Sequence, residues 1–567
     1  MTRELGLWFF IAILALAARA SNLETIPLTN AEAVDALGVL RLVQGEAATL
    51  ANPLFSGLQY ALFSVFDASN MLARLPAAFA GALLCLMPAI VRHQLGRGRA
   101  LAFGGLMALS PLLWMMSRTA DGVILAWAIA VGAWFCWQNS ARRLALILLG
   151  LLVACGRDAV APFLCILVAQ VIQHRWRNVI DRFEAEAPLK SASSIDYFAF
   201  ILAFVLGATA LWFNPAGLGG ALNGIADWFT GLAGGSEAPI AVNRLLSGLW
   251  LYEILFLLAA VLGFITAWLE RDWQRELGWL AFIGLGLALF LVNGSRTAAS
   301  LAPIVIGCAA LAARFVLSMI GQLQTSVQQG TWQTEFTVMG LSTVLLMFAF
   351  LSLLQYSNQG QLAWLVSLVV AGLMIVGISL MFSVNGDVFA PVRGLIGAVG
   401  LCFVIYTAGN GYQLNFVRAD NPGEPYRFNI AASDLNGLVA QIDQISVRAT
   451  GDRGALPIKV DEKAPPALRW ALRAERFLTY GASSGDSMIL LTPLGTQPND
   501  QRAYIGDAFT INTSSNLGNT NCRQIGDKTD CTPLAKWLAF RQITDIKSEQ
   551  WTLWLSQDAA ALASGVR

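Results

Sequence analysis

The stretch LAWLVSLVVAGLMIVGISLMFSV, from Leu362 to Val384, contains no charged residue. It is long enough to cross a lipid bilayer as a helix, which needs about 20 apolar residues. Many similar blocks precede it, and hydrophobic residues make up 56% of the 567 residues. Charged residues make up only 13%, against about 25% in a typical soluble domain. The sequence therefore predicts a polytopic α-helical membrane protein.

We expect about thirteen membrane-spanning helices from the apolar blocks. The block that begins at Leu5 follows Arg3 and has the form of a signal peptide. Because many spans follow it, we interpret it as a retained first span. The expected helices begin near Leu5, Leu72, Ala100, Gly122, Leu144, Ala159, Tyr197, Gly248, Leu277, Ala298, Phe336, Leu362 and Val388.

The loops between these blocks alternate in charge, which predicts an orientation. One set contains clustered basic residues, and basic loops stay in the cytoplasm. The clusters are Arg92, Arg97 and Arg99; Arg142 and Arg143; Arg175, Arg177, Arg182 and Lys190; Arg271 and Arg275. The protein then lies in the inner (cell) membrane with its N-terminus on the cytoplasmic side. An odd number of spans places the chain after Tyr406 on the outer side.

Two domains are predicted. Residues 1–409 form the membrane domain, with a long first outer loop over residues 21–70, and residues 410–567 form a soluble exported α/β domain. In the latter, expected strands and helices alternate: strands over Tyr426–Ile430, Leu456–Val460, Ser487–Leu491 and Ala503–Ile511, and helices over Asp434–Val447 and Pro465–Arg476. Cys522 and Cys531 suit a disulfide in an oxidising compartment. Two free thiols in a cytoplasmic loop are the alternative.

Acidic residues and arginines gather at the expected outer ends of the spans. The motifs are SRTADG with Arg118 and Asp121, GRDAVAP with Arg157 and Asp158, and NGSRT with Arg296. Each could be an interfacial anchor or a local ion pair. Together they suit a lipid phosphate, because guanidinium binds phosphate through paired hydrogen bonds and a carboxylate can act as a base or hold a divalent cation. The net charge of +1 excludes a basic nucleic-acid-binding face.

The first outer loop contains LTNAEAVDALGVLRLVQGE, which begins at Leu28. Its apolar residues recur at helical spacing, so we expect an amphipathic helix along the membrane surface. Thr29 or Asn30 would cap this helix, with Glu32 in its first turn. Alternatively, the only role of Glu32 could be a favourable interaction with the dipole of this helix. Asn30 and Asp35 are further candidate site residues.

Three segments carry a resemblance to a known class. NPLFSGLQYALFSVFDASNMLARLPAAFAG (52–81) and MALSPLLWMMSRTAD (107–121) resemble GT-C membrane glycosyltransferases, among them dolichyl-phosphate-mannose–protein mannosyltransferase-like proteins and aminoarabinose transferases. APPALRWALRAERFLTYG (464–481) is similar to the "flippase activity-associated" membrane protein family. The resemblance implies transfer of a sugar from a polyprenyl-phosphate donor to a protein, lipid or glycan acceptor on the outer side of the membrane, without a nucleotide sugar.

The resemblance also implies residue roles. Glu32 would be the catalytic base and Asp121 a phosphate or metal partner, while Arg118, Arg157 and Arg296 would stabilise the leaving phosphate. The class usually has Asp-Glu-Ala at the first position, where this chain has Ala31, Glu32 and Ala33. A shift of one residue turns a helical side chain by about 100°. The alternative is therefore a non-catalytic membrane subunit or lipid- and glycan-handling scaffold that binds a partner through its exported domain.

Overall fold

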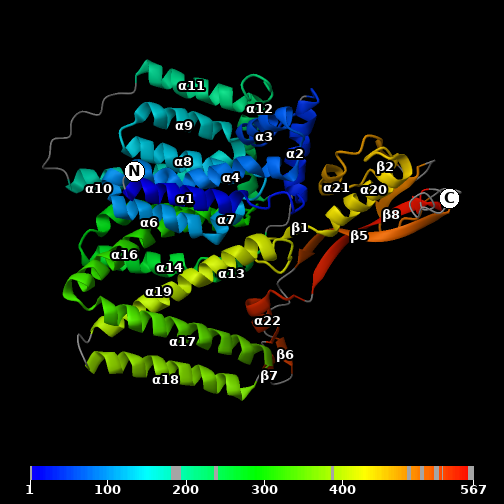
Figure 1. The fold of residues 1–567 in the computed structure, drawn as a ribbon. Coiled ribbons are helices and arrows are strands. Elements are labelled where there is room, and N and C mark those ends of the chain that lie inside the picture. Colours follow the sequence, from blue (N-terminus) through cyan, green and yellow to red (C-terminus); the bar gives the residue numbers. More distant parts are fainter. Residues whose placement is uncertain are drawn as a thin grey trace.

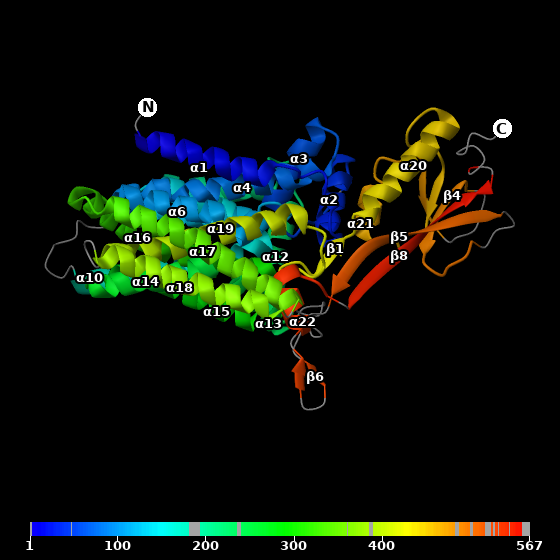
Figure 2. The same cartoon turned by 60° about the horizontal axis from the view of Figure 1, so that its bottom comes forward.

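The computed structural model describes residues 3–46, 48–180, 193–234, 240–359, 361–384, 389–481, 487–498, 503–515, 523–525, 528–530, 532–543, 545–557 and 559. A bundle of helices lying side by side forms one part of the molecule (Figure 1). A part built on strands lies at one end of this bundle, and the N-terminus lies at the opposite end (Figure 2).

Helices occur at every position where a span was expected, and further helices, mostly short, lie between them. They are α1 (Arg3–Ala20), α2 (Asn30–Val43), α3 (Pro53–Val65), α4 (Asn70–Leu86), α5 (Arg92–Leu95), α6 (Arg97–Leu109), α7 (Pro111–Met116), α8 (Val123–Gln138), α9 (Arg142–Ala154), α10 (Val160–Ile180), α11 (Ser194–Ala208), α12 (Gly217–Ala233), α13 (Val242–Tyr252), α14 (Ile254–Leu269), α15 (Leu277–Val292), α16 (Ala302–Gln329), α17 (Trp332–Gln359), α18 (Leu362–Val384) and α19 (Phe389–Tyr412).

Not all of these helices are long enough to span a bilayer by themselves. Within the described residues, seven are long and apolar enough, and the number is eight if α13 and α14, which are bent by 76°, count as one broken span. Pro111 follows the end of α6 and begins α7, so that apolar block is split. The α8 and α9 helices have 16 and 13 residues. A total of thirteen spans stays a prediction.

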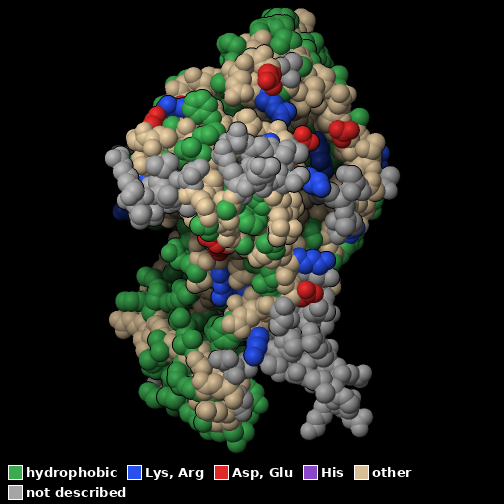
Figure 3. All heavy atoms as spheres, turned by 90° about the vertical axis from the view of Figure 1, so that its right-hand side faces the viewer, with side chains coloured by type: hydrophobic (Ala, Val, Ile, Leu, Met, Phe, Trp, Pro, Cys, Tyr) green, Lys and Arg blue, Asp and Glu red, His purple; other side chains and the backbone are tan. Residues whose placement is uncertain are grey.

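The surface of the bundle is apolar where a membrane would contact it. Large side chains on α17 and α18 are exposed, including Val344, Leu362 and Leu373. Figure 3, which faces the strand-containing end, shows hydrophobic side chains over the region of these two helices and charged side chains spread over the strand-containing part. An apolar surface of this extent marks a membrane or protein contact. Together with the long apolar helices, it identifies an integral membrane protein.

The strand-containing part is an α/β structure with a mixed sheet of six strands. Their order is β1-β5-β8-β4-β2-β3, with β2 parallel to both of its neighbours and the other pairs antiparallel. The strands are β1 (Asn429–Ala431), β2 (Ile458–Val460), β3 (Leu478–Tyr480), β4 (Ile489–Pro493), β5 (Tyr504–Ser515) and β8 (Ile546–Ser556). A separate ribbon pairs β6 (Arg523–Ile525) with β7 (Lys528–Asp530).

The helices of this part are α20 (Asp434–Thr450), α21 (Pro466–Ala471) and α22 (Thr532–Phe540). Leu435, Leu438, Ile442 and Ile445 of α20 are buried against the sheet, as their helical spacing predicts. The expected elements all contain a strand or helix of the expected type. Cys522 and Cys531 lie outside the described residues, so their disulfide stays a prediction, as does the domain boundary at residue 410.

Arg244 on α13 holds the segment between the helical and strand-containing parts. Its guanidinium is buried and donates hydrogen bonds to the carbonyls of Pro422, Glu424, Pro425 and Arg427, and to that of Ser515 at the end of β5, at 2.6–3.2 Å. The guanidinium has five N–H donors in a planar fork, whereas a lysine ammonium has three at a single atom. This one side chain therefore fixes the linker to the bundle.

We expect Arg244→Lys to expose the linker to protease. Losing several charge-assisted hydrogen bonds should lower the free energy of local opening by about 2 kcal/mol. Trypsin should then cut after Arg418 or Arg427 roughly tenfold to fiftyfold faster than in the parent chain. Limited proteolysis with mass spectrometry measures this rate. Arg453→Lys, at an exposed position, should leave the rate unchanged; equal rates in both variants would contradict the role of Arg244.

Candidate functional site

Two adjoining cavities lie where the bundle meets the strand-containing part. The smaller has a volume of about 270 Å³ and the larger about 820 Å³. Asp121, Arg157 and Ser295 line both, so the two cavities meet at these residues. The larger is also lined by the chain from Tyr426 to Ile430, which leads into the sheet. A site here can be reached by groups from both parts.

Three carboxylates surround the smaller cavity. Asp35 comes from α2, Asp121 from the turn before α8, and Asp158 from the 3₁₀ turn over Gly156–Ala159. Asn52 caps α3 and donates from Nδ2 to Oδ2 of Asp158 at 2.7 Å. A Cβ at Gly122 would lie 1.8 Å from that Asn52 nitrogen, so only glycine permits this approach. Local packing therefore fixes Asp158 beside Asp121.

Burial and mutual repulsion alter the acidity of these groups. Burial, and then the neighbouring Asp158 carboxylate, raise the pKa of Asp121 to about 7. Burial and Asp158 also raise the pKa of Asp35 to about 6, although Arg157 opposes the shift. A carboxylate with a pKa near neutrality can accept a proton from a substrate hydroxyl at physiological pH. Raised carboxylate pKa values in a cavity are typical of functional sites.

The arginines at these cavities have hydrogen-bonding capacity left for a ligand. Arg157 donates from Nη2 to Oγ of Ser295 at 3.3 Å. Arg296 lines the larger cavity, and its Nε is buried with no hydrogen-bond partner among the described residues. Arg427 lines the same cavity and donates from Nη1 to the carbonyl of Ala419 at 2.9 Å. These guanidinium groups suit an anion such as phosphate.

Arg118 is not among the lining residues of either cavity. Its guanidinium donates to the backbone carbonyls of Ala18, Arg19, Ser21 and Asn22, which follow or end α1. Its Cζ also lies 4.3 Å from the ring centre of Phe416. These hydrogen bonds and this ring contact account for the burial of the Arg118 side chain without a ligand. The sequence motif that contains it contributes Asp121 to the cavities and Arg118 to the structure around them.

Glu32 lies in a closed network behind the cavities. Its carboxylate accepts hydrogen bonds from Arg74 Nε and Nη2 at 3.1 and 3.0 Å, from the Thr29 backbone and hydroxyl, and from the Ala120 backbone N–H at 2.7 Å. Burial alone would raise the pKa of Glu32, but Arg74 and these hydrogen bonds hold it below its ordinary value. Glu32 is not among the residues that line either cavity.

The amphipathic helix reaches the cavities through another face. Ala31 lines the larger cavity, and Asp35, four residues later, lines the smaller. Residues four apart lie on one face of a helix. The same face of α2 therefore presents the methyl group of Ala31 to the larger cavity and the carboxylate of Asp35 to the smaller cavity. Asn30 serves the contact with the strand-containing part instead, because its Oδ1 accepts from the Ala467 N–H of α21 at 3.0 Å.

Sequence reasoning did not single out Asn52 or Arg427. Asn52 stands directly before Pro53, and an asparagine followed by proline is a helix-start signal, but the sequence does not reveal its bond to Asp158. Arg427 falls within the expected strand Tyr426–Ile430, and the sequence gives no sign that this segment lies beside the bundle. Within the described residues, no group of three or more His, Cys, Asp or Glu side chains is arranged to hold a metal ion.

Comparison with family models and with curated proteins yields no match. Among solved structures, the chain is similar to ArnT from Cupriavidus metallidurans bound to undecaprenyl phosphate, with 12% identity, a TM-score of 0.49, and coverage of 85% of this chain and 86% of that chain. The apo state of the same protein gives 14% identity and a TM-score of 0.47 over 86% and 87%.

The chain is also similar to the Archaeoglobus fulgidus oligosaccharyltransferase tethered with an acceptor peptide, with 11% identity, a TM-score of 0.44, and coverage of 84% of this chain and 63% of that chain. These neighbours are glycosyltransferases of the GT-C class that the sequence motifs resemble. The identities and scores are low, so the function is inferred from the site's own geometry.

Proposed function

We propose that this chain is a membrane glycosyltransferase that moves a sugar from a polyprenyl-phosphate-linked donor to an acceptor hydroxyl. The meeting of acidic and arginine side chains at two adjoining cavities carries the proposal. Asp35 and Asp121 provide carboxylates with raised pKa values, while Arg157 and Arg296 provide guanidinium groups. The larger cavity borders both parts of the molecule, which leaves room for a donor and an acceptor together.

The donor phosphate would be bound by Arg157 and Arg296. The unpartnered Nε of Arg296 supports this assignment, because a buried donor without a partner is costly unless a ligand satisfies it. In the transfer step, the acceptor oxygen attacks the anomeric carbon. The bond from that carbon to the phosphate oxygen breaks, and its electron pair stays with the phosphate. Preorganised guanidinium groups stabilise the charge that develops there.

Asp121 is the residue that we propose as the base. It lines both cavities, so it can lie between a donor in one and an acceptor in the other. In its deprotonated form it takes the proton that the acceptor hydroxyl loses as the new bond forms. Asp35, on the opposite helix α2, would accept a hydrogen bond from a hydroxyl of the bound sugar.

Glu32 has a positioning role in this proposal. Its carboxylate is held by Arg74 and accepts from the N–H of Ala120, the residue before Asp121. The contact with Ala120 braces the loop that carries the base, while Arg74 and Thr29 occupy the remaining acceptor positions of the carboxylate, which argues against Glu32 itself abstracting a proton. We extend the proposal to topology: about thirteen spans, a cytoplasmic N-terminus, and the strand-containing part on the outer side of the inner membrane, where the acceptor would be a protein, lipid or glycan.

The pH dependence of the reaction tests the proposal. The full chain, purified in detergent, is incubated with a panel of undecaprenyl-phosphate-linked hexoses and pentoses, and release of undecaprenyl phosphate is measured. Because Asp121 must be deprotonated to act as base, the rate should rise tenfold per pH unit below its pKa of about 7 and level off above it. A rate that is flat from pH 5 to pH 8, on a donor that is consumed, would exclude Asp121 as the base.

A non-catalytic subunit is the alternative, and one observation favours it. Ala31 presents a methyl group to the larger cavity, at the position where the GT-C class has an aspartate. Absence of donor turnover at every pH, together with a stoichiometric partner that co-purifies with the full chain, would support this alternative. Turnover by the isolated chain would exclude it.

A further inference from the structure

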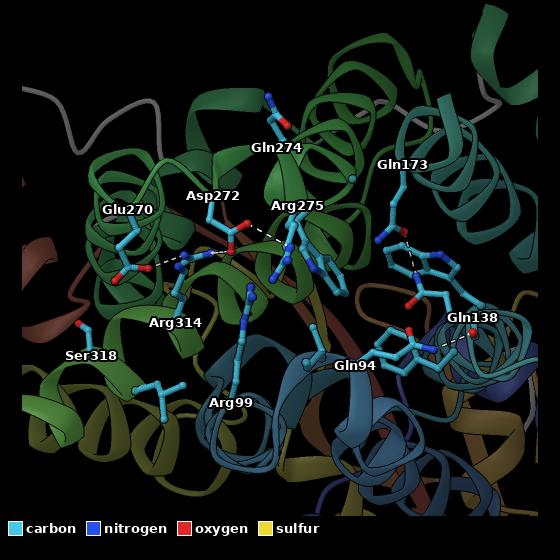
Figure 4. Close-up of a pocket in the computed structure, with 16 residues that line it drawn as sticks. Gln94, Arg99, Gln138, Gln173, Glu270, Asp272, Gln274, Arg275, Arg314 and Ser318 are labelled. Atoms are coloured by element: carbon cyan, nitrogen blue, oxygen red, sulfur yellow. Dashed lines mark hydrogen bonds and ion pairs between the residues drawn. The ribbon is translucent and has the colours of Figure 1, made fainter. Parts of the chain in front are cut away.

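Another cavity lies at the N-terminal end of the bundle, away from the strand-containing part (Figure 2), because one of its walls is α5, whose Arg92 pairs with Glu4 near the N-terminus. Figure 4 shows the residues that line it. Its volume is about 740 Å³. The residues around it come from α5, α6, α8, α10, α15, α16 and the connection between α14 and α15. It shares no lining residue with the two cavities of the proposed transferase site. Any ligand here would therefore bind separately from that site.

The charged groups of this cavity neutralise one another. Three arginines and two carboxylates line it, and the fully buried Glu276 lies behind them. They pair at nitrogen–oxygen distances of 2.5–3.3 Å, in the pairs Arg99–Glu276, Arg314–Glu270, Arg314–Asp272, Arg314–Glu276 and Arg275–Asp272. Figure 4 shows Arg314 directed at Glu270 and Asp272. A phosphate would have to displace these carboxylates and would be repelled by them. The cavity is thus poorly suited to an anion, in contrast to the transferase site with its unpartnered arginine nitrogen.

Glutamine amides form the other polar wall. Gln138 donates from Nε2 to Oε1 of Gln173 at 3.0 Å, and Gln94 donates from Nε2 to the backbone carbonyl of Gln138 at 2.7 Å. Figure 4 shows these three side chains grouped on one side of the cavity. Each amide has two donor hydrogens and an oxygen that accepts two bonds. These bonds use only part of that capacity, so donors and acceptors remain for a ligand that also both donates and accepts.

Aromatic rings line the cavity beside the amides. The ring centres of Trp134 and Trp279 are 4.7 Å apart, and Phe135 packs against both. These rings are almost entirely buried, Trp279 being 6% and Trp134 3% exposed, so they form an apolar wall of which only the edges can contact the C–H groups of a ligand. The volume of the cavity falls within the usual size of a small-molecule site, about 300–1,000 Å³.

We propose that this cavity binds an uncharged, hydroxyl-rich ligand of the hexopyranose type. Hydroxyl groups donate and accept in the same way as the amides of Gln94, Gln138 and Gln173. The paired carboxylates and arginines, held rigid by one another, offer further acceptors and donors without a net charge. The exposed edges of Trp134 and Trp279 contact C–H groups of the sugar. The site is a binding site at the opposite end from the proposed chemistry, and it does not depend on that chemistry.

Saturation-transfer-difference NMR on the full chain in lipid nanodiscs tests this inference. The probes are glucose, mannose and galactose, with inorganic phosphate as the anionic probe. At least one hexose should bind, and Gln138→Leu and Gln173→Leu should each weaken its affinity by about tenfold, because each removes hydrogen bonds to hydroxyls. Phosphate at the same concentration should not displace the hexose from this cavity.

Two controls separate this site from its alternatives. Gln328→Leu, on the exposed end of α16, should leave hexose binding unchanged. Asp121→Asn should also retain the binding that Gln138→Leu loses, whereas a sugar bound only at the transferase site would show the reverse. The proposal is overturned if no hexose binds, if binding is insensitive to both glutamine substitutions, or if phosphate competes with the hexose. Circular dichroism and gel filtration of each variant show that a loss is not misfolding.

Discussion

Replacing Asp121 by Asn is expected to lower the rate of sugar transfer by about 10²–10⁴-fold, the usual contribution of a positioned general base. An amide has nearly the same shape as the carboxylate but cannot take the proton of the acceptor hydroxyl. The hydrogen bond that Oδ1 of Asp121 accepts from the Val123 N–H at 3.2 Å can be kept by the amide oxygen, so the turn before α8 should stay in place. Release of undecaprenyl phosphate from the donor measures the effect.

Asp67→Asn is the matched control, because Asp67 is an exposed aspartate in the first outer loop and does not line either cavity. It should retain the parental rate. A second variant, Asp121→Glu, should retain more activity than Asp121→Asn, since it keeps a carboxylate. If Asp121→Asn turned over the donor as fast as Asp67→Asn, proton abstraction by Asp121 would be excluded and Asp35 would be the remaining carboxylate of raised pKa to test.

Much of the fold follows from apolar block length and periodicity. The block from Leu362 to Val384 is one continuous helix, α18, which begins where it was predicted to begin, because no proline or charged residue interrupts it. The helix α20 has its predicted start at Asp434. The number of spans is harder to predict, because residues such as Pro111 divide an apolar block and a 76° bend separates α13 from α14. The strand β8 was not anticipated, because its place in the centre of the sheet depends on partners far away in the chain.

The candidate site could be predicted as a region but not residue by residue. Charged residues at the outer span ends predicted that Arg118, Asp121, Arg157, Asp158 and Arg296 would gather. The structure brings all of these except Arg118 to the adjoining cavities. The sequence could not separate Glu32 from Asp35. The two lie on one helix, and which of them meets the cavity is decided by Arg74, an arginine 42 residues away from Glu32 in the chain. An ion pair between residues so far apart in the chain leaves no recognisable pattern in the local sequence.

Replacing Arg74 by Met should lower the free energy of unfolding by about 3–5 kcal/mol, the typical effect of removing one partner of a buried ion pair. The side chains of Arg74 and Glu32 are only 3% and 6% exposed. Arg74 also donates to the backbone carbonyls of Leu23, Ile26 and Pro27. Methionine fills similar space but leaves these acceptors and the Glu32 carboxylate without their donor. Unfolding in a detergent titration, followed by tryptophan fluorescence, gives the change.

Arg92→Met provides the control, because the Arg92–Glu4 pair is 40% and 20% exposed and an exposed pair contributes only about 0–1 kcal/mol. The double variant Arg74→Met with Glu32→Gln should lose less than the sum of the two single variants, since it removes both buried charges together. Glu32→Gln should also reduce the transfer rate without moving its rise near pH 7, because the titrating base is Asp121. A loss for Arg74→Met no greater than for Arg92→Met would show that the buried pair does not anchor α2. A shift of the pH profile in Glu32→Gln would return the role of base to Glu32.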